Sequence, residues 1–359
     1  MEDHNRDVIA NEYKKGRGAQ FNTPNKFLKT QVKREHVEAI DDWIEEDIHT
    51  QYIDIFPKTI VNKVDSPDVG MWYSMNPYQG CEHGCIYCYA RNSFEYWGYS
   101  AGVDFESKIL VKKDAPRLLR AFLMNPKWDC VPIGVSGNTD CYQPAERRFR
   151  ITRQLLEVCN EFNQPVGIIT KNAGILRDKD LLQEMASKKL VSVLMSITSF
   201  DETLRRAMEP RTTTGKQRIR VIRELSRAGV PAGVMLGPMI PGLNDHEMPA
   251  ILKAGSEAGA SFSAYTFVRL NGSVKLLFHD WLYKSFPERA DKVWHMIQDG
   301  HNGKVSDSRF GVRMSGEGPL AKLISDQFHT YTNKYGLGYE RMDLDCSRFR
   351  RPGEQGKLF

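Results

Sequence analysis

Three cysteines, Cys81, Cys85 and Cys88, lie within eight residues of one another in the segment NPYQGCEHGCIYCYAR (Asn76–Arg91). Their spacing is C-x3-C-x2-C, and three thiolates on one tight loop can bind three irons of a cubane cluster. The fourth iron would then have no protein ligand nearby, which leaves it open to bind and activate a small molecule. The cysteines therefore predict a [4Fe-4S] centre that does more than carry an electron.

A structural zinc ion is the alternative metal. Zinc sites of this kind close with four ligands, commonly two CxxC-type pairs, and this chain has no second pair. His83 lies between two of the cysteines, but at that spacing it is more typical of a loop residue than of a ligand. The remaining cysteines stand alone in the sequence: Cys130, Cys141, Cys159 and Cys346.

The composition is that of a globular protein with a large core: 41% of the 359 residues are hydrophobic and 26% are charged. The net charge of +5 is compatible with a nucleic-acid partner without requiring one. The N-terminus lacks the apolar segment of a signal peptide, and no stretch reaches the roughly 18 apolar residues of a membrane span. We therefore expect a cytoplasmic protein with no membrane partner. In that reducing compartment a cysteine cluster indicates a metal site rather than disulfides.

Short apolar runs that alternate with amphipathic segments begin at about residue 66. Six runs have the pattern of strands, and helical segments lie between them. This alternation predicts an α/β fold with a parallel sheet, although periodicity alone does not separate a partly closed barrel from an open, doubly wound sheet. The predicted strands are Val69–Met75, Val131–Gly137, Pro165–Thr170, Val191–Thr198, Ala232–Gly237 and Ser261–Phe267.

The predicted helices have recognisable ends. Asp178 has the pattern of an N-cap, and Gly229 and Gly259 follow the last turns of two others. After residue 275 two helices are predicted, starting near Pro287 and Pro319, because proline favours the first helical position. The other predicted helices are a short amphipathic one around residues 40–48, and Ala145–Phe162, Asp178–Lys188, Lys216–Ala228 and Asp245–Ala258.

The cysteine motif follows the first predicted strand and has Tyr87 before its last cysteine; in this it resembles the radical S-adenosylmethionine (SAM) superfamily. More narrowly, the chain resembles, over roughly residues 16–350, the bacterial proteins grouped with spore photoproduct lyase. The resemblance implies a partial (β/α)6 TIM-like barrel with chemistry at the C-terminal ends of its strands. Besides the cysteine motif, it rests on RGAQFN (Arg17–Asn22), SGNTDCYQPAE (Ser136–Glu146), EPRTTTGKQR (Glu209–Arg218) and PMIPGLND (Pro238–Asp245).

In such enzymes SAM binds the open iron of a [4Fe-4S] cluster. The reduced cluster cleaves SAM to methionine and a 5′-deoxyadenosyl radical, which abstracts a hydrogen atom from the substrate, while the protein positions SAM and excludes solvent. The resemblance implies this chemistry and leaves the substrate open, with repair or modification of DNA as one candidate. The expected electron donor is a low-potential reductant such as flavodoxin or ferredoxin.

By the same resemblance, polar residues at the strand ends are candidates for holding SAM. Lys171, after the third strand, is expected to pair with the SAM carboxylate as a point charge. Ser196 on the fourth strand is a candidate hydroxyl donor. Arg211 is a candidate partner of the carboxylate or ribose, with a surface salt bridge to Glu209 as the alternative.

The turn after the second strand is expected to contact the SAM amino group through Ser136, Thr139 and Asp140, unless it only caps a helix. Spore photoproduct lyases carry a cysteine just ahead of the corresponding turn, where it returns a hydrogen atom to the product radical. This chain has Gly137 at that position. Cys141 is the candidate replacement donor, with simple core packing as the alternative.

The C-terminal peptide Gln355–Phe359 resembles the Q-x-x-L-F motif with which bacterial DNA-metabolism proteins dock on the sliding clamp, except that Gly356 replaces the usual leucine. Its Leu and Phe would enter an apolar pocket of the clamp. An idle tail is the alternative. The predicted divisions of the chain are an N-terminal extension (1–60), the radical SAM barrel (61–275), a C-terminal helical region (276–349) and a flexible tail (350–359).

Two other classes of function stay open at this point. One is a non-catalytic iron–sulfur protein that transfers electrons or senses redox state, and the other is a zinc-stabilised nucleic-acid binding module. An electron carrier would normally close its cluster with a fourth cysteine and would not need six βα units. The open cysteine motif and the six predicted strands together favour the enzyme.

Overall fold

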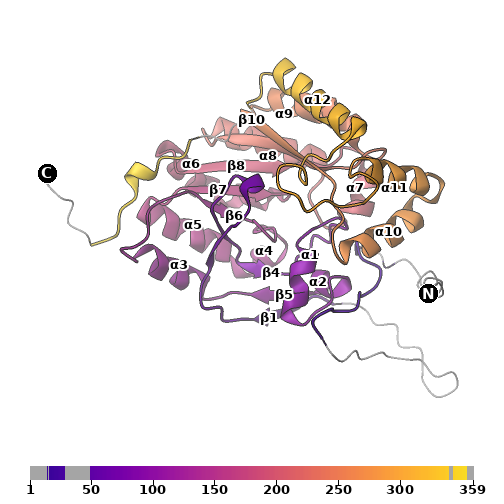
Figure 1. Ribbon diagram of the computed structural model, residues 1–359. Helices are drawn as coiled ribbons and strands as arrows, with labels where there is room; N and C mark the ends of the chain where they lie inside the picture. Colours follow the sequence, from indigo (N-terminus) through magenta and orange to yellow (C-terminus); the bar gives the residue numbers. More distant parts are fainter. Residues whose placement is uncertain (1–13, 15, 29–48, 339–342, 354–359) are drawn as a thin grey trace.

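The computed structural model describes residues 14, 16–28, 49–338 and 343–353. The helix predicted around residues 40–48 and the Gln355–Phe359 peptide lie outside these residues. Figure 1 shows a central sheet with helices packed along it, and the chain's C-terminal helices, in orange and yellow, at the top and right of the view. In the part of the chain that is described, no helix is long and apolar enough to cross a membrane.

The central sheet has seven strands. β2 (Val61–Lys63) pairs antiparallel with β3 at one edge. The other six run parallel and are neighbours in their order along the chain, without the reversal of order that defines a doubly wound sheet. This is the arrangement of a partial (β/α)6 barrel, so the predicted fold class is confirmed. The six strands are β3 (Tyr73–Met75), β6 (Ile133–Val135), β7 (Val166–Thr170), β8 (Val191–Ser196), β9 (Ala232–Met239) and β10 (Phe262–Phe267).

The first parallel strand is shorter than predicted. Val69 belongs to a 3-10 helix, Pro67–Val69, and the strand begins only at Tyr73. The helix ends at Gly70, whose φ of 60° lies in the left-handed region that glycine adopts without strain. The apolar run therefore combines a turn and a strand.

The helix predicted over Ala145–Phe162 is divided in two. α4 (Ala145–Phe149) and α5 (Ile151–Phe162) are separated by Arg150, which has a φ of 52°. The break allows the Glu146 carboxylate to accept a hydrogen bond from the Thr152 N–H at 3.0 Å. Two helices, the second capped by this buried carboxylate, are thus found where the sequence predicts one continuous helix.

Asp178 precedes α6 (Lys179–Ser187), as predicted, but its side chain does not cap that helix. The carboxylate accepts hydrogen bonds from the Tyr142 hydroxyl at 3.0 Å and from the Arg177 guanidinium at 2.8 and 2.9 Å. Asp178 is fully buried, and a buried carboxylate requires such charged and polar partners. Tertiary contacts therefore decide the role of this residue.

The remaining crossover helices, α8 (Gly215–Arg227) and α9 (Met248–Glu257), lie where the sequence predicts them. The C-terminal region has three helices instead of the predicted two: α10 (Val274–Ser285), α11 (Ala290–Asp299) and α12 (Pro319–Lys334). The helix that was not predicted, α10, buries Phe278 and Trp281, and the Trp281 indole donates to the Ala207 carbonyl at 2.9 Å. Its buried positions follow helical spacing, so the sequence did carry the signal.

A strap formed by residues 305–316 connects the two sides of the open barrel. The Phe267 N–H, at the end of β10, donates to the Met314 carbonyl at 2.8 Å. Nε of Arg313 donates to Oδ2 of Asp68 at 2.6 Å, and Asp68 lies in the 3-10 helix before β3. The strap therefore spans the gap between the last parallel strand and the segment that leads into the first.

A second, three-stranded sheet lies beside the barrel in the order β1-β5-β4. β5 (Lys108–Val111) pairs parallel with β1 (Gln51–Asp54) and antiparallel with β4 (Tyr78–Gln79). Because β4 leads directly into the cysteine motif, this small sheet holds the start of that loop. The helices not yet mentioned are α1 (Arg91–Phe94), α2 (Val103–Ser107), α3 (Ala115–Leu123) and α7 (Glu202–Met208).

Candidate functional site

The cysteine loop, residues 80–91, lies against the loops that follow the barrel strands. Its backbone is fixed at two points: the Cys81 N–H donates to the Phe105 carbonyl at 2.8 Å, and the Ile86 N–H donates to the Met208 carbonyl at 3.0 Å. Gly84 lies between these points with a φ of 68°, a conformation that residues with side chains rarely adopt. The loop is thus held in one shape by contacts outside itself.

The three cysteines of this loop are neighbours in space. Cys81 and Cys85 are buried and Cys88 is partly buried. Burial raises the pKa of the Cys81 thiol, and the charges of Asp140 and of the other two cysteines raise it further. Three mutually close thiols on one loop are therefore ready to become thiolate ligands once a metal compensates their charge.

A cubane cluster and a single zinc ion require different arrangements of the thiols. Within the described residues, no three His, Cys, Asp or Glu side chains converge on one point that a metal ion could occupy. One zinc ion needs such convergence, whereas each thiolate of a cubane cluster bonds to a different iron. Three neighbouring thiols on one loop match the number of ligands that a cubane with one open iron requires.

Arg91, three residues after Cys88, supports the loop from inside the protein. It donates from Nε to the Cys85 carbonyl at 3.0 Å and from Nη2 to the Gly84 carbonyl at 3.2 Å. These contacts show that Arg91 binds the backbone of the loop. Its counter-ion, Glu106, was not among the predicted site residues.

The N-terminal segment 16–28 packs on the same ion pair. The Gly18 and Ala19 N–H groups donate to the two Glu106 carboxylate oxygens at 3.0 and 2.8 Å. A Cβ atom on Gly18 would lie 1.9 Å from the Gly84 carbonyl oxygen, so only glycine fits against the cysteine loop. The RGAQFN motif is therefore part of the support of the loop.

Asp140 joins the turn after β6 to two other parts of the site. It accepts hydrogen bonds from the Thr170 hydroxyl and the Lys171 N–H, both at 2.8 Å, and its Oδ2 lies 3.4 Å from Nδ1 of His83 in the cysteine loop. Burial alone would raise the pKa of Asp140, but His83 and these hydrogen bonds lower it. The ionised carboxylate therefore ties β6, β7 and the cysteine loop together.

Ser136 and Thr139 use their hydroxyl groups within the turn itself. Oγ of Ser136, a residue with a φ of 73°, accepts from the Cys141 N–H at 2.8 Å. Thr139 is buried and donates to the Tyr78 carbonyl at 2.7 Å. Both hydroxyls shape the turn, while a direct contact of either with SAM stays a prediction.

Lys171 and Ser196, at the ends of β7 and β8, are brought into contact. Nζ of Lys171 donates to Oγ of Ser196 at 2.7 Å and to the Gly237 carbonyl of β9 at 3.3 Å. It also lies 5.8 Å from the centre of the Tyr87 ring, in the cysteine loop. The ammonium group thus lies where three strand ends meet the loop.

Glu209 is the buried anion behind this lysine. Its carboxylate accepts hydrogen bonds from the Tyr87 hydroxyl, from Thr198 at 2.5 Å and from Arg218 at 2.5 Å, and Oε1 lies 4.0 Å from Nζ of Lys171. Burial alone would raise the pKa of Glu209, yet Arg218 and Lys171 lower it to about 2. The sequence suggests Glu209 only as a surface partner of Arg211, whereas the structure buries it completely.

Arg211 lies on the outer side of the cysteine loop. Its N–H donates to the His83 carbonyl at 3.3 Å, and Nε donates to the Gly16 carbonyl at 3.1 Å. The alternative of a salt bridge with Glu209 is wrong, because Glu209 pairs with Arg218. In this position Arg211 holds the N-terminal segment.

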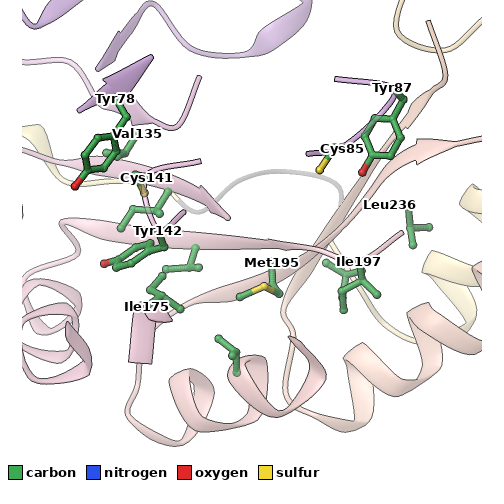
Figure 2. Close-up of a cluster of buried hydrophobic side chains, with 14 of the residues drawn as sticks. Tyr78, Cys85, Tyr87, Val135, Cys141, Tyr142, Ile175, Met195, Ile197 and Leu236 are labelled. Carbon is green, nitrogen blue, oxygen red and sulfur yellow. The ribbon is translucent and has the colours of Figure 1, made fainter. Parts of the chain in front are cut away.

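Cys141 has no exposed surface. Figure 2 shows its side chain among Tyr78, Val135 and Tyr142, away from the part of the core that holds Cys85 and Tyr87. The placement fits the packing alternative, because a hydrogen donor must be reached by the substrate radical. Hydrogen donation by Cys141 therefore stays a prediction that the burial argues against.

Arg269 follows β10 and was not among the predicted site residues, although the C-terminal end of a barrel strand is a known position for functional groups. Its loop is tied to α1: Asn92 donates to the Asn271 carbonyl at 2.9 Å, and the Ser273 N–H donates to Oδ1 of Asn92 at 3.0 Å. Burial and the nearby charge of Arg313 lower the pKa of Arg269. Among the residues described, none forms an ion pair with it, so this partly buried cation can accept an anionic ligand.

Comparison with known proteins gives a consistent result. The family model for the radical SAM superfamily matches residues 75–254. An uncharacterized protein of Mycobacterium bovis is 31% identical over 250 residues, which cover 69% of this chain and 74% of that protein. An uncharacterized protein of Methanocaldococcus jannaschii is 28% identical over 243 residues, which cover 68% of this chain and 86% of that protein.

Among solved structures, spore photoproduct lyase complexed with dinucleoside spore photoproduct aligns with a TM-score of 0.58 at 16% sequence identity, covering 80% of this chain and 81% of that one. This likeness shows a shared fold. The family match begins at the end of β3 and contains the cysteine loop, Asp140, Lys171 and Ser196. The chain belongs to the radical SAM superfamily and is a radical SAM enzyme.

Proposed function

We propose that this enzyme holds a [4Fe-4S] cluster through Cys81, Cys85 and Cys88, binds SAM beside it and acts on a nucleic acid. When bound and reduced, the cluster with SAM supplies a 5′-deoxyadenosyl radical for hydrogen abstraction. The observation that carries the proposal is the set of three neighbouring thiols in one loop, beside the lysine at the end of β7. A low-potential reductant such as flavodoxin or ferredoxin would supply the electron.

Lys171 is the proposed partner of the SAM carboxylate. An ammonium group has three N–H donors, and two of them are used by Ser196 and Gly237. The third is left for a ligand, while Glu209 at 4.0 Å balances the charge without a hydrogen bond. The lysine is therefore oriented before SAM arrives, which lowers the entropy lost on binding.

Asp140 is the proposed carboxylate nearest the SAM amino group. Hydrogen bonds from β7 keep it ionised and fixed, so it can attract an ammonium group without moving. Ser136 and Thr139 would act through the shape of the turn. Arg211 is left out of this part of the proposal because its guanidinium bonds to Gly16.

The nucleic-acid substrate is proposed from charge and from fold. Arg269 offers a cation without an ion-pair partner among the described residues, close to the cysteine loop, and a phosphate is a natural ligand for guanidinium. The related fold of spore photoproduct lyase accommodates a dinucleoside photoproduct. Because Gly137 stands where those lyases have their hydrogen-donating cysteine, the proposal covers nucleic acids as a class and does not extend to that one lesion.

Anaerobic reconstitution tests the radical generator. We expect a brown protein with about four irons per chain that forms 5′-deoxyadenosine from SAM after reduction with dithionite. Alanine at any one of the three loop cysteines should abolish both iron loading and SAM cleavage, whereas Cys159→Ala, outside the loop, should retain both. Iron loading without SAM cleavage would support the electron-transfer or sensor alternative, and a colourless protein with one zinc would support the zinc module.

A second assay tests the substrate class. Single-stranded and duplex oligonucleotides, undamaged or ultraviolet-irradiated, are incubated with the reduced enzyme and SAM, and 5′-deoxyadenosine and altered nucleosides are quantified. Deuterium transfer from a labelled nucleotide into 5′-deoxyadenosine would support the proposal. Equal yields of 5′-deoxyadenosine with and without every oligonucleotide, and no transfer, would exclude it while leaving the radical generator intact.

A further inference from the structure

The segment 343–353 packs across the loops that precede the barrel strands. The Asp345 N–H donates to the Lys189 carbonyl at 2.9 Å, and the Arg350 N–H donates to the Phe162 carbonyl at 3.0 Å. Nη2 of Arg351 donates to the Trp128 carbonyl at 3.0 Å. These partners precede β6, β7 and β8, so the segment lies at the end of the barrel opposite the cysteine loop, and the first residues of the predicted flexible tail are held there.

This docking brings together two cysteines that the cluster does not use. Cys130 precedes β6, Cys346 lies in the docked segment, and both are partly buried. Burial, followed by the charge of the neighbouring Cys346 thiol, raises the pKa of Cys130. The two thiols are therefore neighbours in the folded protein, although 215 residues separate them in the sequence.

The position of Cys130 is fixed by its surroundings. Its thiol donates to Oε1 of Gln164 at 3.7 Å, and the same oxygen accepts from the Trp128 indole at 3.0 Å. The Gln164 amide donates to the Val131 carbonyl at 2.8 Å. The loop that presents Cys130 is thus ordered before any covalent bond forms.

We propose that Cys130 and Cys346 form a redox-sensitive disulfide that fastens the C-terminal segment to the barrel. The reaction needs a disulfide oxidant such as oxidised glutathione. One cysteine thiolate attacks the oxidant and releases one reduced thiol; the other cysteine then displaces the second. Overall, two protein thiols become one disulfide and the oxidant becomes two thiols, so protons and electrons balance.

Two alternatives at this site are less consistent with the contacts. Cys159 contributes less than Cys346 to the charge around Cys130, and it is fully buried. A metal site would need a third ligand, and no three suitable side chains converge there in the described part of the chain. A two-cysteine covalent link is what the contacts support.

The inference is independent of the proposed substrate, and it is tested on the cluster-loaded protein. Anaerobic holoprotein is treated with oxidised glutathione, free thiols are blocked by alkylation, and the digest is analysed by mass spectrometry without reduction. We expect one cross-linked peptide pair containing Cys130 and Cys346, lighter than the sum of the two peptides by about two hydrogen atoms. Reduction should release both peptides.

Cys130→Ser and Cys346→Ser should each abolish the cross-link, while Cys159→Ser should retain it. The oxidised wild type should also resist proteolysis after residue 338 more than the reduced protein or either single variant does. Exclusive Cys130–Cys159 linkage, stable glutathione adducts on both cysteines, or two freely alkylated thiols after oxidation would overturn the proposal. If one variant does not fold, the other still provides the comparison.

Discussion

Arg91 and Glu106 form an ion pair with 2.5 Å between Nη2 and Oε1, and neither side chain has any exposed surface. The arginine holds two carbonyls of the cysteine loop, and the glutamate holds two N–H groups of the N-terminal segment. Burial of such a charge pair would be costly by itself, and these hydrogen bonds to both partners offset that cost. It couples the order of the loop to residues that precede it by more than 60 positions in the chain.

Loss of Arg91 should therefore be severe. Arg91→Ala leaves the Glu106 carboxylate buried without its partner, so we expect a loss of about 3–5 kcal/mol in unfolding free energy and a failure to load iron. Lys113→Ala is the matched control, because it breaks an exposed ion pair with Asp54 and should cost less than about 1 kcal/mol. Denaturant unfolding of the apoprotein provides the measurement, and equal stability losses in the two variants would refute this account.

Lys112 predicts a pH effect on stability. It is buried, donates to the Asn76 carbonyl at 2.9 Å, and has a pKa lowered by burial from 10.5 to about 8. Between these values the unfolded chain binds more protons than the folded one, so this group makes stability rise with pH from about 8 to about 10. Lys112→Met should remove that rise.

The comparison for Lys112 is the difference in unfolding free energy between wild type and variant at pH 7.5 and 9.5. Other titrating groups largely cancel in that difference. We expect the unfolding free energy of the wild type to rise with pH relative to that of the variant, by at most about 1.4 kcal/mol per pH unit. A difference that stays constant or falls with pH would contradict the burial of a charged lysine.

Lys171 should dominate SAM affinity. Lys171→Ala in the reconstituted protein should weaken SAM binding about tenfold to a hundredfold, because a charged hydrogen bond contributes roughly 1.5–3 kcal/mol. Lys188→Ala, which removes a lysine paired with Glu184 on the surface, should leave binding unchanged. Equilibrium dialysis with labelled SAM gives the affinities without turnover, and unchanged binding in Lys171→Ala would remove the lysine from the proposed site.

Arg269 should contribute to nucleic-acid binding through one phosphate. Arg269→Gln is expected to weaken binding of a fluorescent oligonucleotide and to reduce the salt dependence of the binding constant by about one counterion. Arg309→Gln is the control, because that arginine is already paired with Asp307 and Glu317. An equal loss of oligonucleotide affinity in both variants, or no loss in either, would contradict a phosphate site at Arg269.

Gly137 is a tightly enclosed position. A Cβ atom there would lie 2.9 Å from Cβ of Ser74, whereas on Gly167 of β7 it would meet only Oγ of Ser192 at 3.9 Å. Gly137→Ala should therefore cost about 1–3 kcal/mol by overpacking, and Gly167→Ala should be close to neutral. Thermal unfolding of the two variants distinguishes them; a neutral Gly137→Ala would mean that the lyase cysteine could be accommodated here without rearrangement.

The sequence predicts those elements correctly whose structure depends on a local pattern of apolar and turn residues. All six parallel strands were predicted, because buried strands are continuous apolar runs with turn residues between them. It was less reliable where a distant side chain intervenes. The break at Arg150 depends on the Glu146 carboxylate, and the role of Asp178 depends on Tyr142 and Arg177.

For the site, the sequence by itself determined the three cysteines, since ligands on one loop have a spacing that can be recognised. It also located the strand ends that carry Asp140, Lys171 and Ser196. Only the tertiary structure decided that Glu209 is the buried partner of Arg218, that Arg211 faces the N-terminal segment, and that Cys141 is enclosed. It also placed Cys130 near Cys346. The physical reason is that these relationships join residues far apart in the chain, and charge pairing and burial are properties of the folded neighbourhood rather than of any local pattern.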